Sequence, residues 1–481
     1  MNRKGVALSA PGKVLLAGGY LVLDRNYTGL VFGLDARIHA CVQDLPTRTG
    51  VSLSEIIVRS PQFDEAEWRY GYRLADNGGG IEVTQLTDSS VSSVRNPFVE
   101  TALAYALSYV KSREVPEIGP SVVTILADND YYSPTGADTS DPRLESRFRS
   151  FGVPIHRAHK TGLGSSAAVV TALVAAILSY YLSTNDLDLA NVTGRIKLHN
   201  LAQTAHCAAQ GKVGSGFDIA AAVFGSCVYR RFSASILEKL GGLGTPKFAA
   251  RLKSLVDDNG KPSAWDTEIT PGVRLPRGLR LAMCDVDCGS QSVSMAKGVL
   301  AWRKEKSTEA NEIWSQLQRE NDKLQIALER LHKMQQSHVK QYDEVLQRIS
   351  TKGAPLNEVW DGIYSELCSS IAAIRASIQR MSLASDVPIE PPSQTKLLDA
   401  CSGLPGVIGG LVPGAGGYDA VVLLLVDRSD IIESLQNLLR HWRVNTEDAG
   451  GVRAGQVRML GVREELQGLR AEEVDYRPWI E

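Results

Sequence analysis

The sequence lacks an excess of either charge. It has 52 Lys and Arg residues against 54 Asp and Glu residues, a formal net charge of −2. A chain so balanced has no general attraction to nucleic acid or to an acidic membrane surface. We therefore expect no nucleic-acid partner, and any phosphate site must draw on local positive charge.

Long apolar runs and a cysteine framework are also missing. No stretch reaches the length of a membrane span, so we expect no stable membrane association. Seven scattered cysteines are an odd number, which argues against a disulfide framework and favours reduced thiols. Neither end carries a secretory, retrieval or lipidation signal, so we expect a cytoplasmic protein.

Two common phosphate-binding signatures are absent. The chain has no Gly-x-x-x-x-Gly-Lys-Ser/Thr motif and no Gly-x-Gly-x-x-Gly in a dinucleotide-binding arrangement, which excludes P-loop hydrolases and Rossmann enzymes. With 481 residues and 43% hydrophobic residues, the chain is globular and too long for one ordinary core. We expect two or more lobes.

One stretch can nevertheless bind an anion. Lys160–Ala168 reads Lys-Thr-Gly-Leu-Gly-Ser-Ser-Ala-Ala and runs directly into the apolar segment Val169–Leu178, which is predicted to be a buried helix. A helix start offers unsatisfied N–H groups and a positive dipole end, which suit phosphate. Alternatively, Ser165 or Ser166 only caps a core helix. The stretch alone leaves both interpretations open.

Short apolar runs near the N-terminus predict a mostly antiparallel sheet. Val6–Ser9 and Val14–Leu16 are predicted strands, with a turn forced by Pro11 and Gly12 that places Lys13 at the start of the second strand. Further strands are predicted at Gly29–Val42, Glu55–Ser60, Trp68–Leu74, Ile81–Leu86 and Ser121–Ala127.

The polar segment 128–157 has the composition of a mobile loop, which is either a lid or an inert surface insertion. Asp218 follows the glycine-rich segment 211–216 and starts a predicted helix; such an Asp is usually a cap, although the glycines favour a functional carboxylate. Trp302–Ile349 is charged and free of glycine, which predicts one long helix or a helical pair.

Three glycine-rich motifs occur in a fixed order: Pro11–Lys13, Gly162–Ala167 and Gly414–Gly417. This set resembles the GHMP kinase superfamily. Within it, Gly18–Tyr20 reads Gly-Gly-Tyr where mevalonate kinases carry Gly-Glu-His, and Lys160-Thr161 stands where they have a proline-rich turn. The chain is therefore most similar to eukaryotic, and in particular fungal, phosphomevalonate kinases.

The resemblance implies an α+β fold of two lobes. Residues 1–232 would form a ribosomal-protein-S5-like α/β lobe, and residues 233–481 a ferredoxin-like α+β lobe with a helical insertion at about 300–350. The implied reaction is ATP-dependent phosphorylation of (R)-5-phosphomevalonate to (R)-5-diphosphomevalonate with release of ADP, in the mevalonate pathway of isoprenoid and sterol biosynthesis. ATP and Mg²⁺ are the implied cofactors, and the protein would be a monomer or homodimer.

The same resemblance assigns site residues. Lys13 and Asp218 would be catalytic, with Lys13 bridging the two phosphates and Asp218 mainly an orienting group. The ATP phosphates would contact Lys160, Thr161, Gly162, Leu163, Gly164, Ser165, Ser166, Ala167 and Ala168, and Ser166 would bind Mg²⁺. A supporting loop would comprise Gly414, Ala415, Gly416 and Gly417. Candidate substrate contacts are Tyr20, His156, Ser290, Ser292 and Lys297. His156, Lys297 and also Lys160 are candidates for the acceptor phosphate by their place in the sequence alone.

Elementary electrostatics makes cations the main need of such a site. The second pKa of a phosphate monoester is about 6, so the acceptor is largely ionised at neutral pH. Two unit charges about 4 Å apart repel by roughly 4 kcal/mol at an effective dielectric near 20. The alternatives are another GHMP small-molecule kinase such as mevalonate kinase, a non-catalytic ATP-binding sensor, and a scaffold built on Trp302–Ile349. The sensor has no need to keep both Lys13 and Asp218.

Overall fold

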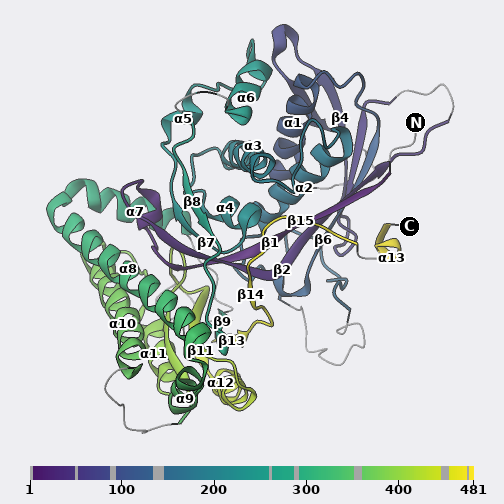
Figure 1. Cartoon of the computed structure of the whole chain (residues 1–481). Coiled ribbons are helices and arrows are strands. Elements are labelled where there is room, and N and C mark those ends of the chain that lie inside the picture. Colours follow the sequence, from purple (N-terminus) through teal and green to yellow (C-terminus); the bar gives the residue numbers. More distant parts are fainter. Residues whose placement is uncertain are drawn as a thin grey trace.

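The computed structural model describes residues 4–48, 53–86, 94–133, 146–258, 260, 263–286, 292–351, 360–445, 454–473 and 476–480. Their strands form two sheets, one of ten strands and one of five. Helices α1 to α4 gather beside the larger sheet, while α8 to α12 surround the smaller one (Figure 1). The predicted two-lobed α+β architecture is confirmed.

The elements have the following bounds. The larger sheet contains β1 (Val6–Ala17), β2 (Gly29–Asp44), β3 (Glu55–Arg59), β4 (Glu67–Leu74), β5 (Ile81–Gln85), β6 (Ser121–Ala127), β7 (Cys227–Arg230), β8 (Glu268–Pro271), β14 (Glu464–Glu465) and β15 (Arg470–Ala471). The smaller sheet contains β9 (Leu279–Val286), β10 (Val407–Leu411), β11 (Ala420–Val426), β12 (Arg443–Asn445) and β13 (Ala454–Met459).

The helices are α1 (Pro97–Ser112), α2 (Ser165–Tyr181), α3 (Val192–Gln210), α4 (Phe217–Phe224), α5 (Ser235–Glu238), α6 (Phe248–Asp257), α7 (Ser292–Glu305), α8 (Ser307–Ser337), α9 (Val339–Ile349), α10 (Trp360–Ser385), α11 (Pro392–Ser402), α12 (Ser429–His441) and α13 (Arg477–Ile480). Three short 3₁₀ turns are η1 (Leu21–Leu23), η2 (Asp76–Gly78) and η3 (Asn129–Tyr131).

The predicted turn at Pro11 and Gly12 is wrong. β1 runs unbroken through both residues, and its antiparallel register with β2 shifts there instead, so that Pro11 lies opposite Arg37 and Gly12 opposite Leu34. A bulge of this kind takes up extra residues without ending the pairing. Lys13 therefore lies inside a long strand. The mostly antiparallel character of the sheet is confirmed; among the described strands of this sheet, β3 and β6 form the parallel pair.

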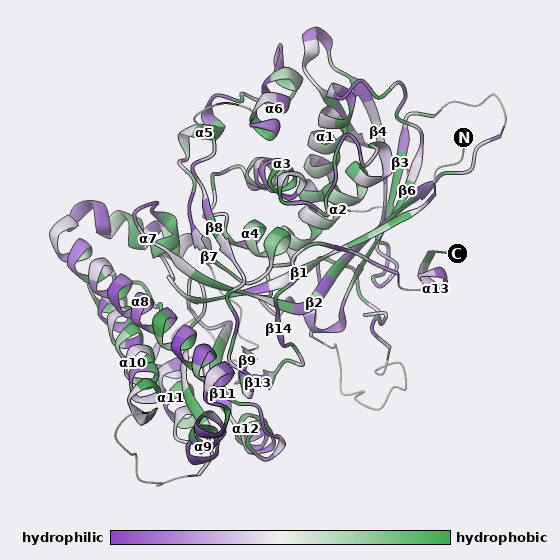
Figure 2. Cartoon of the chain, in the orientation of Figure 1, coloured by the Kyte–Doolittle hydropathy of each residue, from purple (hydrophilic) through white to green (hydrophobic). Residues whose placement is uncertain are grey.

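The predicted long helix or helical pair over Trp302–Ile349 is divided between three helices. Breaks at Lys306 and His338 separate α7, α8 and α9. Hydrophobic and hydrophilic residues alternate along α8 (Figure 2), as its buried side chains Trp314 and Leu317 require. This amphipathic helix packs along α10, so the insertion is covered on its apolar side.

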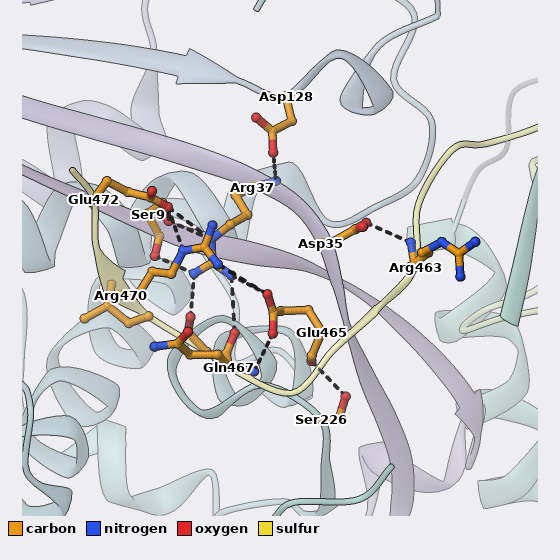
Figure 3. A network of polar contacts seen from close by, with 12 residues as sticks. Ser9, Asp35, Arg37, Asp128, Ser226, Arg463, Glu465, Gln467, Arg470 and Glu472 are labelled. Atoms are coloured by element: carbon orange, nitrogen blue, oxygen red, sulfur yellow. Dashed lines mark hydrogen bonds and ion pairs between the residues drawn. The ribbon is translucent and has the colours of Figure 1, made fainter. Parts of the chain in front are cut away.

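Residues 464–472, here called the C-terminal strap, complete the larger sheet. β14 pairs with β2, and β15 pairs with β1 through Leu8 and Ser9. The fully buried Arg37 binds the strap: its guanidinium donates to the Gln467 carbonyl at 3.2 Å and lies 3.8 and 3.7 Å from the carboxylates of Glu465 and Glu472 (Figure 3). Paired carboxylates offset the cost of burying this cation.

The strap also fixes the C-terminal end of α4. The Leu469 N–H donates to the Val223 carbonyl at 3.1 Å, and a Cβ on Gly468 would lie 2.1 Å from the same oxygen. β8, β14 and β15 come from beyond residue 232 but belong to the larger sheet. The boundary between residues 232 and 233 remains a prediction, because strands from both sides of it share one sheet.

Glu464 makes the strap sensitive to pH. Burial raises the pKa of Glu464 to about 7, although its carboxylate accepts a hydrogen bond from the Leu275 N–H at 3.0 Å. The folded state therefore binds this proton more tightly than the unfolded chain does. As the pH rises through about 7 the buried carboxyl ionises, and its contribution to the free energy of folding is lost. Between about pH 5 and pH 8, the Tm of the parent should fall relative to that of Glu464→Gln, which cannot titrate. Thermal unfolding followed by circular dichroism at each pH measures the difference, with exposed Glu433→Gln as the control. Parallel curves for parent and Glu464→Gln would contradict the prediction.

Candidate active site

A cleft of 550 Å³ lies between the two sheets. Its walls come from β1, the loop before α2, the end of α3, the start of α4, α7 and the loop between β10 and β11. All three glycine-rich motifs noted in the sequence contribute lining residues, namely Lys13, Gly162, Gly164, Gly414 and Gly416. The fold therefore brings together segments that are about 400 residues apart in the chain.

The segment Lys160–Ala168 forms a loop that starts α2. Gly162 and Gly164 have φ values of +74° and +83°, a region that favours glycine, and Gly164 is the N-cap of the helix. The loop is attached to β1, since the Lys13 N–H donates to the Leu163 carbonyl at 3.0 Å. α2 has no acidic residue in its first turn, so its dipole end is free to attract an anion.

Lys13 and Asp218, the predicted catalytic pair, both line the cleft. The Lys13 ammonium donates to the Gly162 carbonyl at 3.2 Å and lies 5.7 Å from the centre of the Phe217 ring. Burial lowers the pKa of Lys13, and the nearby Asp218 carboxylate opposes this shift by favouring the charged form. Asp218 is the second residue of α4, with Oδ1 accepting from the Ile219 N–H at 3.0 Å.

Several of the predicted phosphate-loop residues have buried side chains that lie outside the cleft lining. Thr161 is buried, and its hydroxyl donates to the Asp130 carbonyl at 2.5 Å. Leu163, Ala167 and Ala168 are buried among apolar neighbours. Ser166 lines the cleft together with the two glycines.

The structure separates the predicted substrate contacts. Tyr20 and Lys297 line the cleft, whereas His156 and Lys160 are exposed and outside its lining. The Tyr20 hydroxyl donates to the Ala415 carbonyl at 2.7 Å, so it joins β1's end to the glycine loop. Ser290 lies outside the described residues, and Ser292 is the first residue of α7.

The glycine loop Gly414–Gly417 lies against the start of the chain. A Cβ on Gly19 would lie 2.7 Å from the Gly414 carbonyl oxygen, and a Cβ on Gly416 would lie 2.2 Å from the Ile389 carbonyl oxygen. The Gly417 N–H donates to the same Ile389 carbonyl at 2.8 Å. Close backbone approach explains these glycines, as expected for a supporting loop.

The predicted mobile segment 128–157 is described only in part. Residues 134–145 lie outside the described residues. In the described part of the segment that precedes α2, Phe148 and Phe151 are buried, and the Arg147 side chain lies 2.6 Å from the Asp128 carboxylate. The choice between a lid and an inert insertion stays a prediction.

Sequence reasoning missed several cleft residues, among them His206, Gln210, Lys212 and Phe217. Lys212 follows the end of α3 at the start of the glycine-rich segment that leads to Asp218, which was the available signal. Together with Lys13 and Lys297 it makes three lysines around one cleft. Within the described part of the chain, neither Lys212 nor Lys297 pairs with a carboxylate, so both are available to an anionic ligand.

The loop provides a matched test of how Lys13 is placed. A Cβ on Gly164 would lie 2.7 Å from Lys13 Cε, whereas a Cβ on Gly162 meets nothing within 4 Å. Both glycines have positive φ, so alanine strains the backbone at either position. Gly164→Ala should therefore lower kcat at least about tenfold more than Gly162→Ala, since a misplaced catalytic group is costly. Steady-state kinetics measures this, and equal losses would show that backbone strain alone is responsible.

The residues present fit a hard cation accompanied by phosphates. The Ser166 hydroxyl and the Asp218 carboxylate both line the cleft and supply oxygen ligands, the type that Mg²⁺ prefers. Among the described residues, no group of three or more His, Cys, Asp or Glu side chains could hold a metal by itself. Because Mg²⁺ is usually bound by one or two protein groups plus phosphate oxygens, this sparse set is the expected one.

The chain has the fold of a GHMP kinase. A family model described as the GHMP kinases N terminal domain matches residues 142–226. The solved structure of a Lin0012 protein from Listeria innocua aligns over 98% of this chain and 100% of that one, with a TM-score of 0.64 and 17% identity. Streptococcus pneumoniae phosphomevalonate kinase in complex with phosphomevalonate and AMPPNP aligns over 90% and 95%, with a TM-score of 0.55 and 16% identity.

Comparison with curated relatives shows which family of GHMP kinases the chain belongs to. The phosphomevalonate kinase of Aspergillus fumigatus is 46% identical over 98% of both chains, and that of Gibberella zeae is 46% identical over 99% of this chain and 98% of its own. The chain therefore belongs to the phosphomevalonate kinase family. In the described residues, no helix is both long and apolar enough to cross a membrane.

Proposed function

We propose that this protein transfers the γ-phosphoryl group of ATP to the phosphate of (R)-5-phosphomevalonate, giving (R)-5-diphosphomevalonate and ADP. One observation supports this most directly. Three lysines and a glycine-rich helix start surround the same cleft as Asp218. Such a site suits two phosphate groups that must approach each other against their mutual repulsion.

The residues have distinct roles in this proposal. Backbone N–H groups at the start of α2 bind the ATP phosphates, and Ser166 is a ligand for Mg²⁺, which when bound would neutralise phosphate charge. Lys13 lies at the loop and bridges the acceptor and the transferring phosphoryl. Asp218 favours the charged form of Lys13, and in this proposal it also orients Lys13 and the acceptor. Lys212 and Lys297 line the cleft, and in this proposal they are the cations that bind the acceptor phosphate.

A substrate panel tests the function. Formation of ADP is measured in a coupled assay with ATP, Mg²⁺ and either phosphomevalonate or mevalonate. Turnover with phosphomevalonate and little with mevalonate is the expected result. Preference for mevalonate would favour mevalonate kinase activity, and nucleotide binding without turnover on either would favour a sensor.

Location and assembly are separate proposals. A relative from Arabidopsis thaliana, 33% identical over 88% of this chain, is named as a peroxisomal phosphomevalonate kinase. We propose that this chain is cytoplasmic and that it is a monomer or a homodimer. Fractionation of cells expressing the full chain, and light scattering of the purified protein, test these two points.

A further inference from the structure

His206 lies between the two oxygen-bearing groups of the site. It is a buried residue on α3 with 2% of its surface exposed, and its ring is tilted against Phe98. Nε2 lies 3.1 Å from the Ser166 hydroxyl oxygen, and Nδ1 lies 4.0 Å from Asp218 Oδ2. None of the three glycine-rich motifs includes this residue, and the mechanism above does not use it.

The groups beside the two ring nitrogens favour one tautomer. The side-chain nitrogen of Gln210 lies 3.2 Å from Nε2. A carboxylate can only accept, so the Asp218 carboxylate beside Nδ1 favours the tautomer that carries its proton there and leaves the single lone pair of Nε2 as an acceptor. The Ser166 hydroxyl and the Gln210 amide then share that lone pair, and the Ser166 hydrogen points at Nε2. Both lone pairs of the Ser166 oxygen are left for the cleft.

We propose that His206 is a positioning residue that holds Ser166 as an oxygen ligand for the metal–nucleotide complex. Without the imidazole, the hydroxyl hydrogen is free to turn toward the cleft and occupy the place of the cation. Groups that orient a metal ligand in this way typically affect metal affinity by about 10- to 100-fold. The proposal rests on the proposed ATP site but not on the identity of the acceptor.

Three substitutions separate the two ring nitrogens. His206→Gln puts an amide near the position of Nε2 and can keep the contact with Ser166, whereas His206→Asn reaches only the position of Nδ1. His206→Phe keeps the ring packed on Phe98 and loses both nitrogens. The probe is a fluorescent ATP analogue titrated onto the full chain, without acceptor, once with Mg²⁺ and once with EDTA.

With Mg²⁺, we expect the Kd of the analogue to rise about tenfold or more in His206→Asn and His206→Phe, and by no more than about twofold in His206→Gln. With EDTA, all three variants should stay within about twofold of the parent. Adding His206→Phe to Ser166→Ala should cause no further loss, because the two residues act through one hydroxyl.

The matched control is His199→Gln. His199 is buried on the same helix but packs against Phe224 and Trp265, away from the cleft. It reports the general effect of losing a buried imidazole, and its Mg²⁺-dependent affinity should not change. Equal losses in the Gln and Asn variants at position 206, equal losses with EDTA, or additivity with Ser166→Ala would each overturn the proposal. Because no acceptor is present, these outcomes are independent of the substrate panel.

Discussion

Replacing Lys13 by Met is expected to lower kcat by at least about a thousandfold while leaving the fold intact. Methionine keeps the length and apolar stem of the side chain but removes the ammonium that lies beside the Gly162 carbonyl at the phosphate loop. Preorganised charge in a water-poor site is the largest contributor to phosphoryl transfer, and one such donor is worth about 10²- to 10³-fold. The loss should be at the high end, because the acceptor is itself an anion.

The measurement pairs kinetics with folding. kcat is determined at saturating ATP and phosphomevalonate, and the Tm is recorded by circular dichroism. The control is Lys111→Met on α1, whose ammonium donates to the Val115 and Pro116 carbonyls away from the cleft. It should cost some stability and little turnover. A Lys13→Met enzyme with a near-normal kcat would remove this residue from the mechanism.

Replacing Asp218 by Asn is expected to lower kcat by at least about a hundredfold. The carboxylate favours the charged form of Lys13, so its loss lowers the pKa of Lys13 further. Any decline in rate at alkaline pH should therefore move to lower pH. The acid limb near pH 6 should stay in place, because it reports ionisation of the substrate phosphate.

A full pH–rate profile of parent and Asp218→Asn checks both limbs. If the acid limb moves or disappears in the variant, Asp218 is the general base. Asp257→Asn serves as a control, since this carboxylate accepts from Tyr109 and pairs with Lys197 far from the cleft lining. Its profile should match that of the parent in shape.

Local patterns predicted most elements of the fold. The strand predicted at Gly29–Val42 and the helix predicted at Val169–Leu178 follow from apolar runs, and they correspond to β2 (Gly29–Asp44) and α2 (Ser165–Tyr181). Pro11 and Gly12 led to the wrong prediction of a turn, because a proline within an apolar run is compatible with a bulge as well as with a turn. β14 and β15 have two residues each and could not be found locally; distant partners alone define them.

The site residues that could be predicted are those that belong to, or directly follow, the glycine-rich segments of the sequence. Lys13, Gly164, Ser166 and Asp218 meet in one cleft, although nothing in periodicity brings them together; the resemblance to a known superfamily did so. His206 was missed because a histidine in the middle of a helix carries no signal of its own partners. Contacts between α3, α2 and α4 become visible only once the helices are packed.

The C-terminal strap determines when the catalytic lobe can be completed during synthesis. Ser9 pairs with Arg470, so about 460 residues separate the two partners of one strand pair. A ribosome must therefore make nearly the whole polypeptide before β1 gains this neighbour and Arg37 meets its carboxylates. Such non-local closure is slow, and the unpaired strand edge is prone to aggregation while it waits. Lowering the expression temperature should therefore raise the yield of folded protein more for this chain than for a protein whose N-terminal lobe contains all of its own strands.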